Sequence, residues 1–583
     1  MKRMKKLLAM FLILCIILSQ ESIVAMASEV GTVATENTIK TVCTGTLGDN
    51  NGFKWTYDPI TNTLTVTGKD SGLEGKQAEY SRESLFSKLT YNGVDVEFKK
   101  IVFYECTFKG SLAGMLAGMD ELTSIRFIDC DTSEVTDMSD MFMSCYGLTS
   151  LDVSCFDTSS VTNMSGMFFE CSYYLESIEL GDFDTSKVTD MSSMFAGCWA
   201  DDIDVSNFDT SKVTDMSSMF FECGADDIDV SNFDTSKVTD MSEMFCQTGI
   251  TSIDVSNFDT SKVTDMGGMF GGCGSLKFVD VSSFDTSKVT NMHAMFMLCD
   301  SLKSVDLSSF NTSRVKDFGA MFAFCYNLVK VNVSHLDTSK ANDIKEMFWD
   351  CKKLKSLDLS NWNLSKVNSD GCQNFLTGCK SLEVLYSPKC IKKGLSIKLP
   401  VKLYDSNNKA VTQITSKQVK KVFTKKGVYS ITYKLNGGKN SSKNPLSYKK
   451  TTSTIILKNP TRKGYTFKGW YRDSKYKKKI TQIKKGSTGS LVLYAKWSPN
   501  TYTIKFKGNG ATSGKMSSLT KCKYGTTYKL SANKFKRKGY TFVGWSTKAN
   551  GKGKIYKNKA SVKNLTSAKG KTVVLYAQWR KNK

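Results

Sequence analysis

The stretch "SNFDTSKVTDMSSMF" at residues 206–220 returns almost unchanged at residues 231–245 and 256–270. Looser copies lie on both sides, and each copy ends in a Met-Phe pair that recurs every 25–27 residues. A fixed period of this length predicts a solenoid, in which each repeat forms one coil. The pairs are Met141-Phe142, Met167-Phe168, Met194-Phe195, Met219-Phe220, Met244-Phe245, Met269-Phe270, Met295-Phe296, Met321-Phe322 and Met347-Phe348, and the degenerate pairs Met115-Leu116 and Asn374-Phe375 extend the array to about eleven units.

The repeat is too short for a pair of helices, because helical-pair repeats need about 34 residues. In "VTDMSSMFAGC" (188–198), Met, Phe and Cys residues fall at i, i+3, i+4 and i+7, which predicts one face of a short helix. The Asp before this pattern is expected to cap the helix N-terminus. The predicted caps are Asp190, Asp215, Asp240 and Asp265, and the predicted core residues are Met194, Phe195, Cys198, Met219, Phe220, Cys223, Met269, Phe270 and Cys273.

The segment "DIDVSNF" (202–208) predicts a strand, because Ile203 and Val205 alternate with polar residues. The "DTS" that follows is expected to turn a corner, since such side chains bond their own backbone. A short second strand is expected around Val213. Each coil is therefore predicted to hold a strand, a corner, a second strand and a capped helical turn, and the array at 101–387 is predicted to be mainly β with short helices.

These motifs resemble a known family. The unit "FDTSKVTDMSxMFxxC…IDVSNF" resembles the repeats of BspA-like leucine-rich-repeat surface proteins, over about residues 102–385. The resemblance implies a right-handed solenoid on an exported protein of bacteria or protists, with adhesion or protein binding as its role. Residues 42–68 resemble the hairpin that precedes such arrays, so residues 28–100 are expected to form a cap in which Trp55 and Tyr57 cover the first coil.

Two further copies of another unit follow the array and a connector or cap at 388–427. "GYTFKGW" (464–470) returns 75 residues later as "GYTFVGW", and "LYAKW" (493–497) returns as "LYAQW" (575–579). These motifs resemble Listeria–Bacteroides repeats, the B repeats of internalins, which implies small β-grasp-like modules at 428–498 and 499–583. Gly469 is expected to ease a bend in its strand. The predicted module core is Tyr465, Trp470, Trp497, Tyr540, Trp545 and Trp579.

The N-terminus has the layout of a signal peptide. "MKRMKK" is followed by an apolar run and by "AMAS", and the run is too short for a comfortable membrane span of about 20 residues. We therefore expect residues 1–27 to be cleaved and the mature chain to be a monomer without a transmembrane span, secreted or held non-covalently at a surface. The alternative is an uncleaved anchor.

Most of the 18 cysteines follow the repeat. A metal or disulfide ladder is the alternative to buried thiols, but metal sites need clustered ligands and the chain has only His293 and His335. We therefore expect buried thiols and no metal or cofactor. The column is Cys145, Cys171, Cys198, Cys223, Cys273, Cys299, Cys325 and Cys351, with Cys246 two residues early and Cys379 one late. Cys43, Cys106, Cys130, Cys155, Cys372, Cys390 and Cys522 lie outside it, and their pairing stays open.

The net charge of +24 hides two opposite halves. From Ile391 onward there are 48 Lys and Arg against two acids, and before it there are 32 basic and 54 acidic residues. In the solenoid, a column of outward-facing Asp residues and a row of Lys residues form the candidate ligand-facing surface. The Lys row is expected to neutralise the charge of the Asp column. The alternative is a charged face that only keeps the sheet soluble. The candidate residues are Asp204, Asp229, Asp254, Asp280 and Asp306 with Lys212, Lys237, Lys262 and Lys288.

Of the 48 basic residues in the C-terminal part, 44 are Lys, whereas base reading in nucleic-acid grooves favours Arg. With an export signal, genomic nucleic acid is not an expected partner. Diffuse Lys charge instead suits a polyanion such as teichoic acid, a host glycosaminoglycan or extracellular DNA. The alternative is a basic surface that is merely solvated.

Together these patterns predict a non-enzymatic, secreted or cell-surface binding protein. Its solenoid would bind a host or bacterial surface protein or glycan, and its basic modules would act as spacer or electrostatic anchor. The alternative is a secreted enzyme or toxin whose solenoid presents substrate. That alternative requires an asymmetric group of residues, and Asn342–Asp370 is the most irregular stretch of the array.

Overall fold

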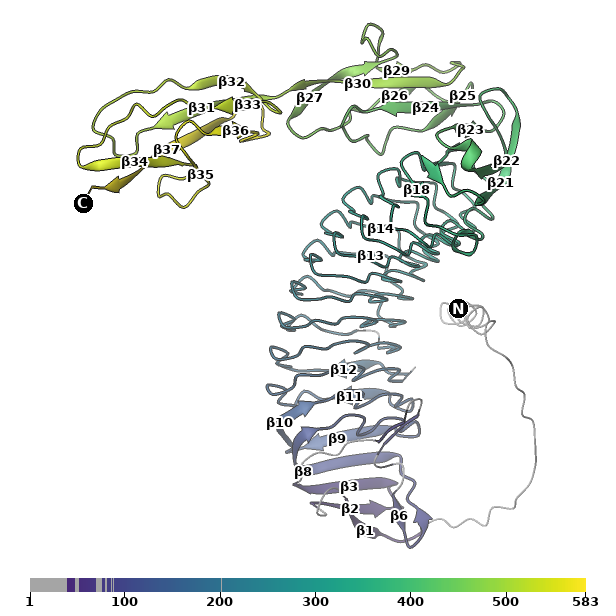
Figure 1. The fold of residues 1–583 in the computed structure, drawn as a ribbon. Coiled ribbons are helices and arrows are strands. Elements are labelled where there is room, and N and C mark those ends of the chain that lie inside the picture. Colours follow the sequence, from purple (N-terminus) through teal and green to yellow (C-terminus); the bar gives the residue numbers. More distant parts are fainter. Residues whose placement is uncertain are drawn as a thin grey trace.

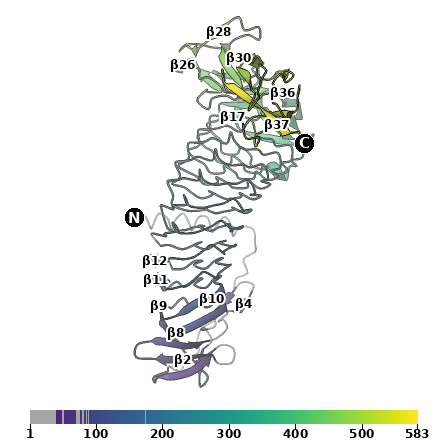
Figure 2. The ribbon, with the colours of Figure 1, turned by 90° about the vertical axis from the view of Figure 1, so that its left-hand side faces the viewer.

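In a computed structural model, the chain forms a long stack of coils followed by two small β modules (Figures 1 and 2). The structure describes residues 39–582 apart from 48–51, 70–75, 79–80, 85, 87–88, 173 and 201. The expected signal peptide at 1–27 lies outside the described residues. Within the described part of the chain, no helix is both long and apolar enough to cross a membrane.

A small sheet begins the stack. Strands β1 (Cys43–Leu47), β2 (Phe53–Asp58) and β3 (Thr63–Lys69) form an antiparallel meander. β8 (Lys100–Ser111) pairs in parallel with β3, β9 (Ser124–Ile128) and β10 (Asp131–Asp137). Trp55 and Tyr57 of β2 are buried in the same core as the first coils. Two short hairpins lie beside this sheet: β4 (Lys76–Ala78) with β5 (Ser81–Glu83), and β6 (Thr90–Tyr91) with β7 (Val94–Asp95).

The strands of the coils are shorter than the sequence predicts. They are β11 (Ser150–Asp152), β12 (Ser177–Glu179), β13 (Ser252–Ile253), β14 (Phe278–Val279), β15 (Ser304–Val305), β16 (Lys330–Val331), β17 (Ser356–Asp358) and β19 (Val384–Tyr386), all in parallel pairs. In the described residues around Ile203 and Val205 only one bridge, Ser177 to Asp202, remains. The predicted alternation still holds, since Ile203 and Val205 are buried. The second strand near Val213 is reduced to single bridges such as Asp190 to Asp215.

The predicted short helices are wrong. Residues 192–197 form consecutive tight turns, in which the N–H groups of Met194 and Cys198 bond carbonyls three residues back, at 3.3 and 3.2 Å. The alternate N–H groups leave the turn: Phe195 donates to the Met219 carbonyl of the next coil at 2.9 Å. A helix would direct all of these groups along its own axis. The i, i+3, i+4, i+7 pattern arises here because successive tight turns also return side chains to one side.

Two residues in each coil make this alternation possible by adopting left-handed backbone angles. In one coil they are Ser193 (φ 54°) and Gly197 (φ 64°). Their N–H groups donate to the next coil at 2.8 and 2.7 Å. Since this conformation costs non-glycine residues about 1–2 kcal/mol, the bonds between coils must offset it. Gly268 occupies the place of Ser193 in a later copy, with a φ of 63°.

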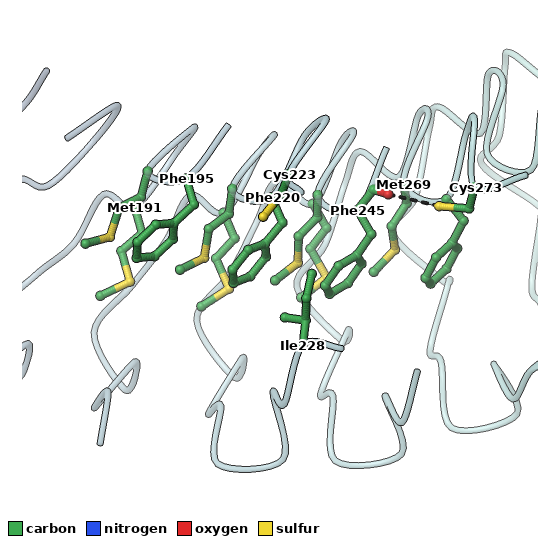
Figure 3. Close-up of a cluster of buried hydrophobic side chains, with 14 of the residues drawn as sticks. Met191, Phe195, Phe220, Cys223, Ile228, Phe245, Met269 and Cys273 are labelled. Carbon is green, nitrogen blue, oxygen red and sulfur yellow. Dashed lines mark hydrogen bonds between the residues drawn. The ribbon is translucent and has the colours of Figure 1, made fainter. Parts of the chain in front are cut away.

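Every predicted core residue of the coils is buried (Figure 3). The Phe rings stack in a continuous ladder with centroids 5.4–5.9 Å apart and planes within 13° of parallel. The ladder consists of Phe142, Phe168, Phe195, Phe220, Phe245, Phe270, Phe296, Phe322 and Phe348. Each coil thus gives the same apolar groups to one shared interior.

The last unit is displaced by one residue from the pairing that its sequence suggests. Phe348 donates its N–H to the carbonyl of Phe375, and Cys379 donates to the carbonyl of Leu376. The Met-Phe positions are therefore held by Phe375 and Leu376, and Asn374 is the left-handed residue before them, with a φ of 52°. In this register Cys379 lies in line with the other cysteines, and the prediction that it comes one residue late is wrong.

The cysteine column consists of buried thiols, and all cysteines of the described residues are free. Their sulfur atoms add bonds between coils: Cys273 Sγ lies 3.0 Å from the Phe245 carbonyl (Figure 3). In the coil where Cys246 comes early, buried Thr248 takes the column position and bonds the same carbonyl at 2.9 Å. Outside the column, the Cys106 thiol donates to the Val66 carbonyl at 3.3 Å, and the Cys130 thiol donates to the Phe103 carbonyl at 3.5 Å.

The end of the stack is covered by antiparallel strands. β23 (Val422–Thr424) pairs with β19, and β21 (Ser396–Tyr404) pairs with β23 and β22 (Ala410–Thr415), so the edge of the coil sheet is not left open. β18 (Asn363–Leu364) pairs with β20 (Cys390–Ile391). Single-turn 3-10 helices form at η4 (Asp370–Cys372) and η5 (Ser416–Gln418).

The two modules have the same sheet order. In the first, β25 (Ser447–Lys449), β24 (Val428–Lys434), β30 (Leu491–Pro499), β27 (Tyr465–Tyr471) and β28 (Lys479–Ile480) form one sheet, beside β26 (Ile455–Ile456) with β29 (Gln482–Ile483). In the second, the matching strands are β32 (Leu519–Lys523), β31 (Thr501–Lys507), β37 (Thr572–Lys581), β34 (Tyr540–Ser546) and β35 (Ile555–Tyr556), beside β33 (Thr527–Lys529) with β36 (Ser561–Lys563). A β-grasp-like topology and a right-handed solenoid stay predictions.

The predicted module core is partly correct. Trp470 and Trp545 are buried, and Trp497 and Trp579 pack half-buried beside them. Tyr465 and Tyr540 are not core residues, because each lies half-buried under an Arg guanidinium, at 3.8 and 3.9 Å. The strand is irregular between Phe467 and Gly469 (φ 126°), which agrees with the predicted bend.

Replacing Phe245 by Ala removes one ring from the middle of the ladder. We expect the free energy of unfolding to fall by about 3–5 kcal/mol, because the neighbouring coils cannot close the gap. Urea denaturation followed by circular dichroism measures this loss. Phe278, whose side chain is 62% exposed, is the matched control, and its replacement by Ala should change stability by less than about 0.5 kcal/mol. A loss below about 1 kcal/mol at Phe245 would contradict the shared core.

Alkylation of the native protein should distinguish the column thiols from the exposed one. Burial raises the pKa of Cys145 and of Cys325 to about 12, so almost no reactive thiolate is present at pH 8. Cys155 is exposed and should react with iodoacetamide, while Cys145 and Cys325 should stay unmodified until urea is added. Peptide mass spectrometry reads each site separately. Equal rates at Cys145 and Cys155 without denaturant would show that the column is open to solvent.

Candidate binding surfaces

The Asp column lies on the exposed side of the short strands. Asp204, Asp229, Asp254, Asp280 and Asp306 are all exposed. Each accepts a hydrogen bond at 2.9–3.0 Å from the backbone N–H of the Ser two residues later, which fixes the carboxylate at the strand end. These atoms form a regular row of outward-facing carboxylates, one in each coil.

These hydrogen bonds favour the ionised form of Asp204, Asp229, Asp254 and Asp280. The Ser206 hydroxyl and N–H hold the pKa of Asp204 below its ordinary value. The pKa of Asp229 is lowered by Ser231 in the same way, although its neighbours Asp204 and Asp254 act in the opposite direction. The column therefore carries negative charge that repels itself, and a cationic partner would relieve the repulsion.

The Lys row is exposed but lies beside a different acidic column, so the prediction that it offsets the Asp204 column is wrong. The pKa of Asp209, in the "DTS" corner, is lowered first by hydrogen bonds from Ser211 and then by the charge of Lys212. Lys237 and Lys262 act in the same way on Asp234 and Asp259. In the described residues no ion pair joins the Lys row to the Asp204 column. The Lys row therefore lies nearer to the "DTS" carboxylates than to the Asp204 column, and Lys288 belongs to this row by its place in the repeat.

The Thr in the same corner has a structural role that was not predicted from the sequence. The Thr of each "DTS" is buried, and its hydroxyl bonds the next coil: Thr210 donates to the Asp234 carbonyl at 3.1 Å and accepts from the Asp234 N–H at 2.8 Å. The invariance of Thr among the copies was the available signal. These residues are therefore part of the scaffold and not of a ligand site.

The predicted helix caps have no helix to cap. Asp190, Asp215, Asp240 and Asp265 accept the N–H two residues later at 2.8–2.9 Å, which is the bond of an Asx turn. They also pair with one another through backbone bridges from coil to coil. Their carboxylates fix the entry to each tight turn. Across the described residues, no group of three or more His, Cys, Asp or Glu side chains could hold a metal ion.

The C-terminal modules carry the opposite charge. Residues 502–578 contain 18 Lys and Arg and no acid, so no side chain within this segment can neutralise them. Lys505 and Lys507 of β31 and Lys521 and Lys523 of β32 are exposed. Because Arg462 and Arg537 stack on tyrosines, the charge that is open to a partner comes mainly from Lys.

Comparison with protein families finds two matches. Residues 110–222, 175–278 and 272–384 match the family described as "Mycoplasma protein of unknown function, DUF285". Residues 429–496 and 502–578 match the Listeria–Bacteroides repeat domain. The first set of matches falls on the coil stack, and the second falls on the two modules.

Relatives and solved structures resemble parts of the chain. Two proteins of Evansella cellulosilytica, named "Putative membrane protein" and "Putative Gly-rich membrane protein", are 28% identical over 26% of this chain and 32% identical over 20% of it. The matches span only 22% and 13% of those two proteins. A leucine-rich repeat protein from Eubacterium ventriosum matches 64% of this chain and all of its own, at 13% identity and a TM-score of 0.23.

The repeat, the coil stack and both family matches agree on the nature of the chain. Its coils carry the "DTS" and Met-Phe signatures, and its modules carry "GYTFxGW" and "LYAxW". The chain therefore combines BspA-like repeats of the DUF285 type at residues 110–384 with two Listeria–Bacteroides repeats at 429–496 and 502–578.

Proposed function

We propose that this protein is exported through residues 1–27 and binds at a cell surface, without catalytic activity, through two surfaces of opposite charge. The basic modules hold a polyanionic surface such as teichoic acid or a glycosaminoglycan. The solenoid presents its Asp column to a protein or glycan partner. The observation that carries this proposal is the unneutralised charge of residues 502–578, with 18 basic residues and no acid.

The order of the charges supports a direction of binding. A polyanion attracts the modules and repels the acidic coils, so the protein would attach by its C-terminal part. The modules project sideways from the C-terminal end of the stack (Figure 1), which leaves the N-terminal coils at a distance from such a surface. The Asp column would then face a second partner.

Neutralising the second module tests the anchor. We expect a variant with four Lys-to-Gln substitutions to elute from immobilised heparin and wall teichoic acid at lower salt, because fewer counterions are released on binding. The logarithm of the affinity should also fall less steeply with the logarithm of the salt concentration. The substitutions are Lys505→Gln, Lys507→Gln, Lys521→Gln and Lys523→Gln.

The solenoid offers a control with the same change in net charge. Its Lys row lies beside acidic residues, so removing four of these charges should leave retention almost unchanged. The control substitutions are Lys212→Gln, Lys237→Gln, Lys262→Gln and Lys288→Gln. If the control weakens retention as much as the module variant does, the attraction follows net charge alone and the proposed anchor fails.

A further inference from the structure

A cleft of about 840 Å³ lies where the end of the coil stack meets the first module. One wall comes from the coils, with Lys330, Asn332, His335 and Asp358. The other wall comes from residues 431–435 and 438–442 of the module, and Lys389 and Lys421 lie between the walls. Its volume is within the usual range of small-ligand sites, about 300–1,000 Å³.

Direct contacts hold the two walls together. The Tyr386 hydroxyl donates to the Ile431 carbonyl at 2.8 Å, and Lys449 forms an ion pair with Glu383 at 2.6 Å. Across the cleft, Lys439 Nζ donates to the Ser308 carbonyl at 2.9 Å. Val384 and Val428 pack with Tyr386 in a small apolar cluster at the junction. The cleft is thus formed before a ligand arrives, which lowers the entropic cost of binding.

The lining of the cleft is strongly cationic. Asp358 is its only acid, and burial raises the pKa of this carboxyl above its ordinary value. Burial also lowers the pKa of Lys330, so both groups are poorly solvated. In such surroundings an anion gains more from nearby lysines than it would in water. The six lysines that line the cleft are Lys330, Lys389, Lys420, Lys421, Lys434 and Lys439.

Amides and hydroxyls make up much of the remaining polar lining. Asn332, Asn361 and Asn440 lie on both walls, with Ser334 and Ser360 beside them. Groups that both donate and accept suit a ligand with many hydroxyls, whereas an acidic peptide would use mainly the lysines. The segment 342–370, where the enzyme alternative expected an asymmetric site, contributes Asp358 to the cleft. Glycoside hydrolysis usually requires two carboxylates, and the lining of the cleft contains only this one.

We propose that this cleft binds an anionic oligosaccharide, with its carboxylate or sulfate groups against the lysines and its hydroxyls against the Asn and Ser side chains. This inference rests on the proposed binding function and gives it a second contact of defined shape. The cleft would hold the end or a short stretch of a polyanion, while the outer lysines of the modules make diffuse contacts.

His335 provides a reporter inside the cleft. Its Nε2 lies 2.9 Å from the Leu307 carbonyl oxygen. Burial of the ring, and then the charge of Lys439, lower the pKa of His335 below its ordinary value, while the hydrogen bond to Leu307 and the charge of Asp306 act in the opposite direction. A bound anion would favour the imidazolium and raise this pKa. The other histidine, His293, lies 3.5 Å from Asp317 and does not line the cleft, so it is an internal control.

The test is a pH titration of the full chain with labelled histidines, observed by NMR at low salt. We expect a heparin-derived tetrasaccharide or tetragalacturonate to raise the pKa of His335 by about 1 and to leave His293 unchanged. If only the heparin-derived tetrasaccharide raises the pKa, the recognised group is sulfate. If tetragalacturonate alone raises it, the recognised group is carboxylate. An unchanged His335 overturns the proposal, and so does an equal effect of hexaglutamate, which would assign the cleft to acidic peptides.

Paired variants place the site. Lys389→Gln with Lys434→Gln, one between the walls and one on the module wall, should weaken tetrasaccharide binding by about tenfold or more, because each removes a charge-assisted bond. Lys529→Gln with Lys563→Gln, exposed on the second module, should change it by less than about twofold. If both pairs of substitutions weaken tetrasaccharide binding equally, the proposal that the cleft is the binding site is wrong. If heparin retention depends on the second module while His335 does not respond, the anchor stands and the cleft proposal fails.

Discussion

Hydrogen bonds from the tight turns of one coil to the next are the interaction on which the rest of the structure depends. Because two residues of each coil adopt left-handed angles, every second N–H leaves its turn and donates to the following coil at 2.6–3.1 Å, as Phe220 does to Met244. A coil of 25 residues cannot bury a core of its own, so it is stable only between neighbours. The copies must then be nearly identical, since a residue that changes the path of one turn displaces the acceptors of the turn before it.

This constraint also explains the surfaces. Once the coils are in register, any polar position of the repeat becomes a column, and the carboxylate of Asp204 reappears in each following coil. A protein built in this way gains a long, uniform surface at no further cost, but a site that needs unlike groups side by side must arise where the repetition ends. The junction with the first module is such a place, since coils near Lys330 and strands near Lys434 bring different residues together there.

The sequence was sufficient for the period, for the buried Met, Phe and Cys columns and for the two C-terminal modules, because repetition and burial follow directly from spacing. It was misleading for the turn at Met191–Cys198, since a helix and two successive tight turns place the same side chains on one side. The register of the last unit at Phe375 was not predictable, and neither was the position of Lys212 beside Asp209. Both depend on the path of the backbone in three dimensions, which a local sequence pattern does not determine. The cleft was not predictable, because its walls lie about 100 residues apart in the chain.

Far-UV circular dichroism of residues 39–583 tests most directly whether the coils are joined turn to turn. If the tight turns give half of their N–H groups to the next coil, the spectrum will be that of strands and turns, without the double minimum of α-helix. A helical signal large enough for one short helix in each of the coils would contradict this account, because those N–H groups would then be bonded within their own segment and could not join the stack.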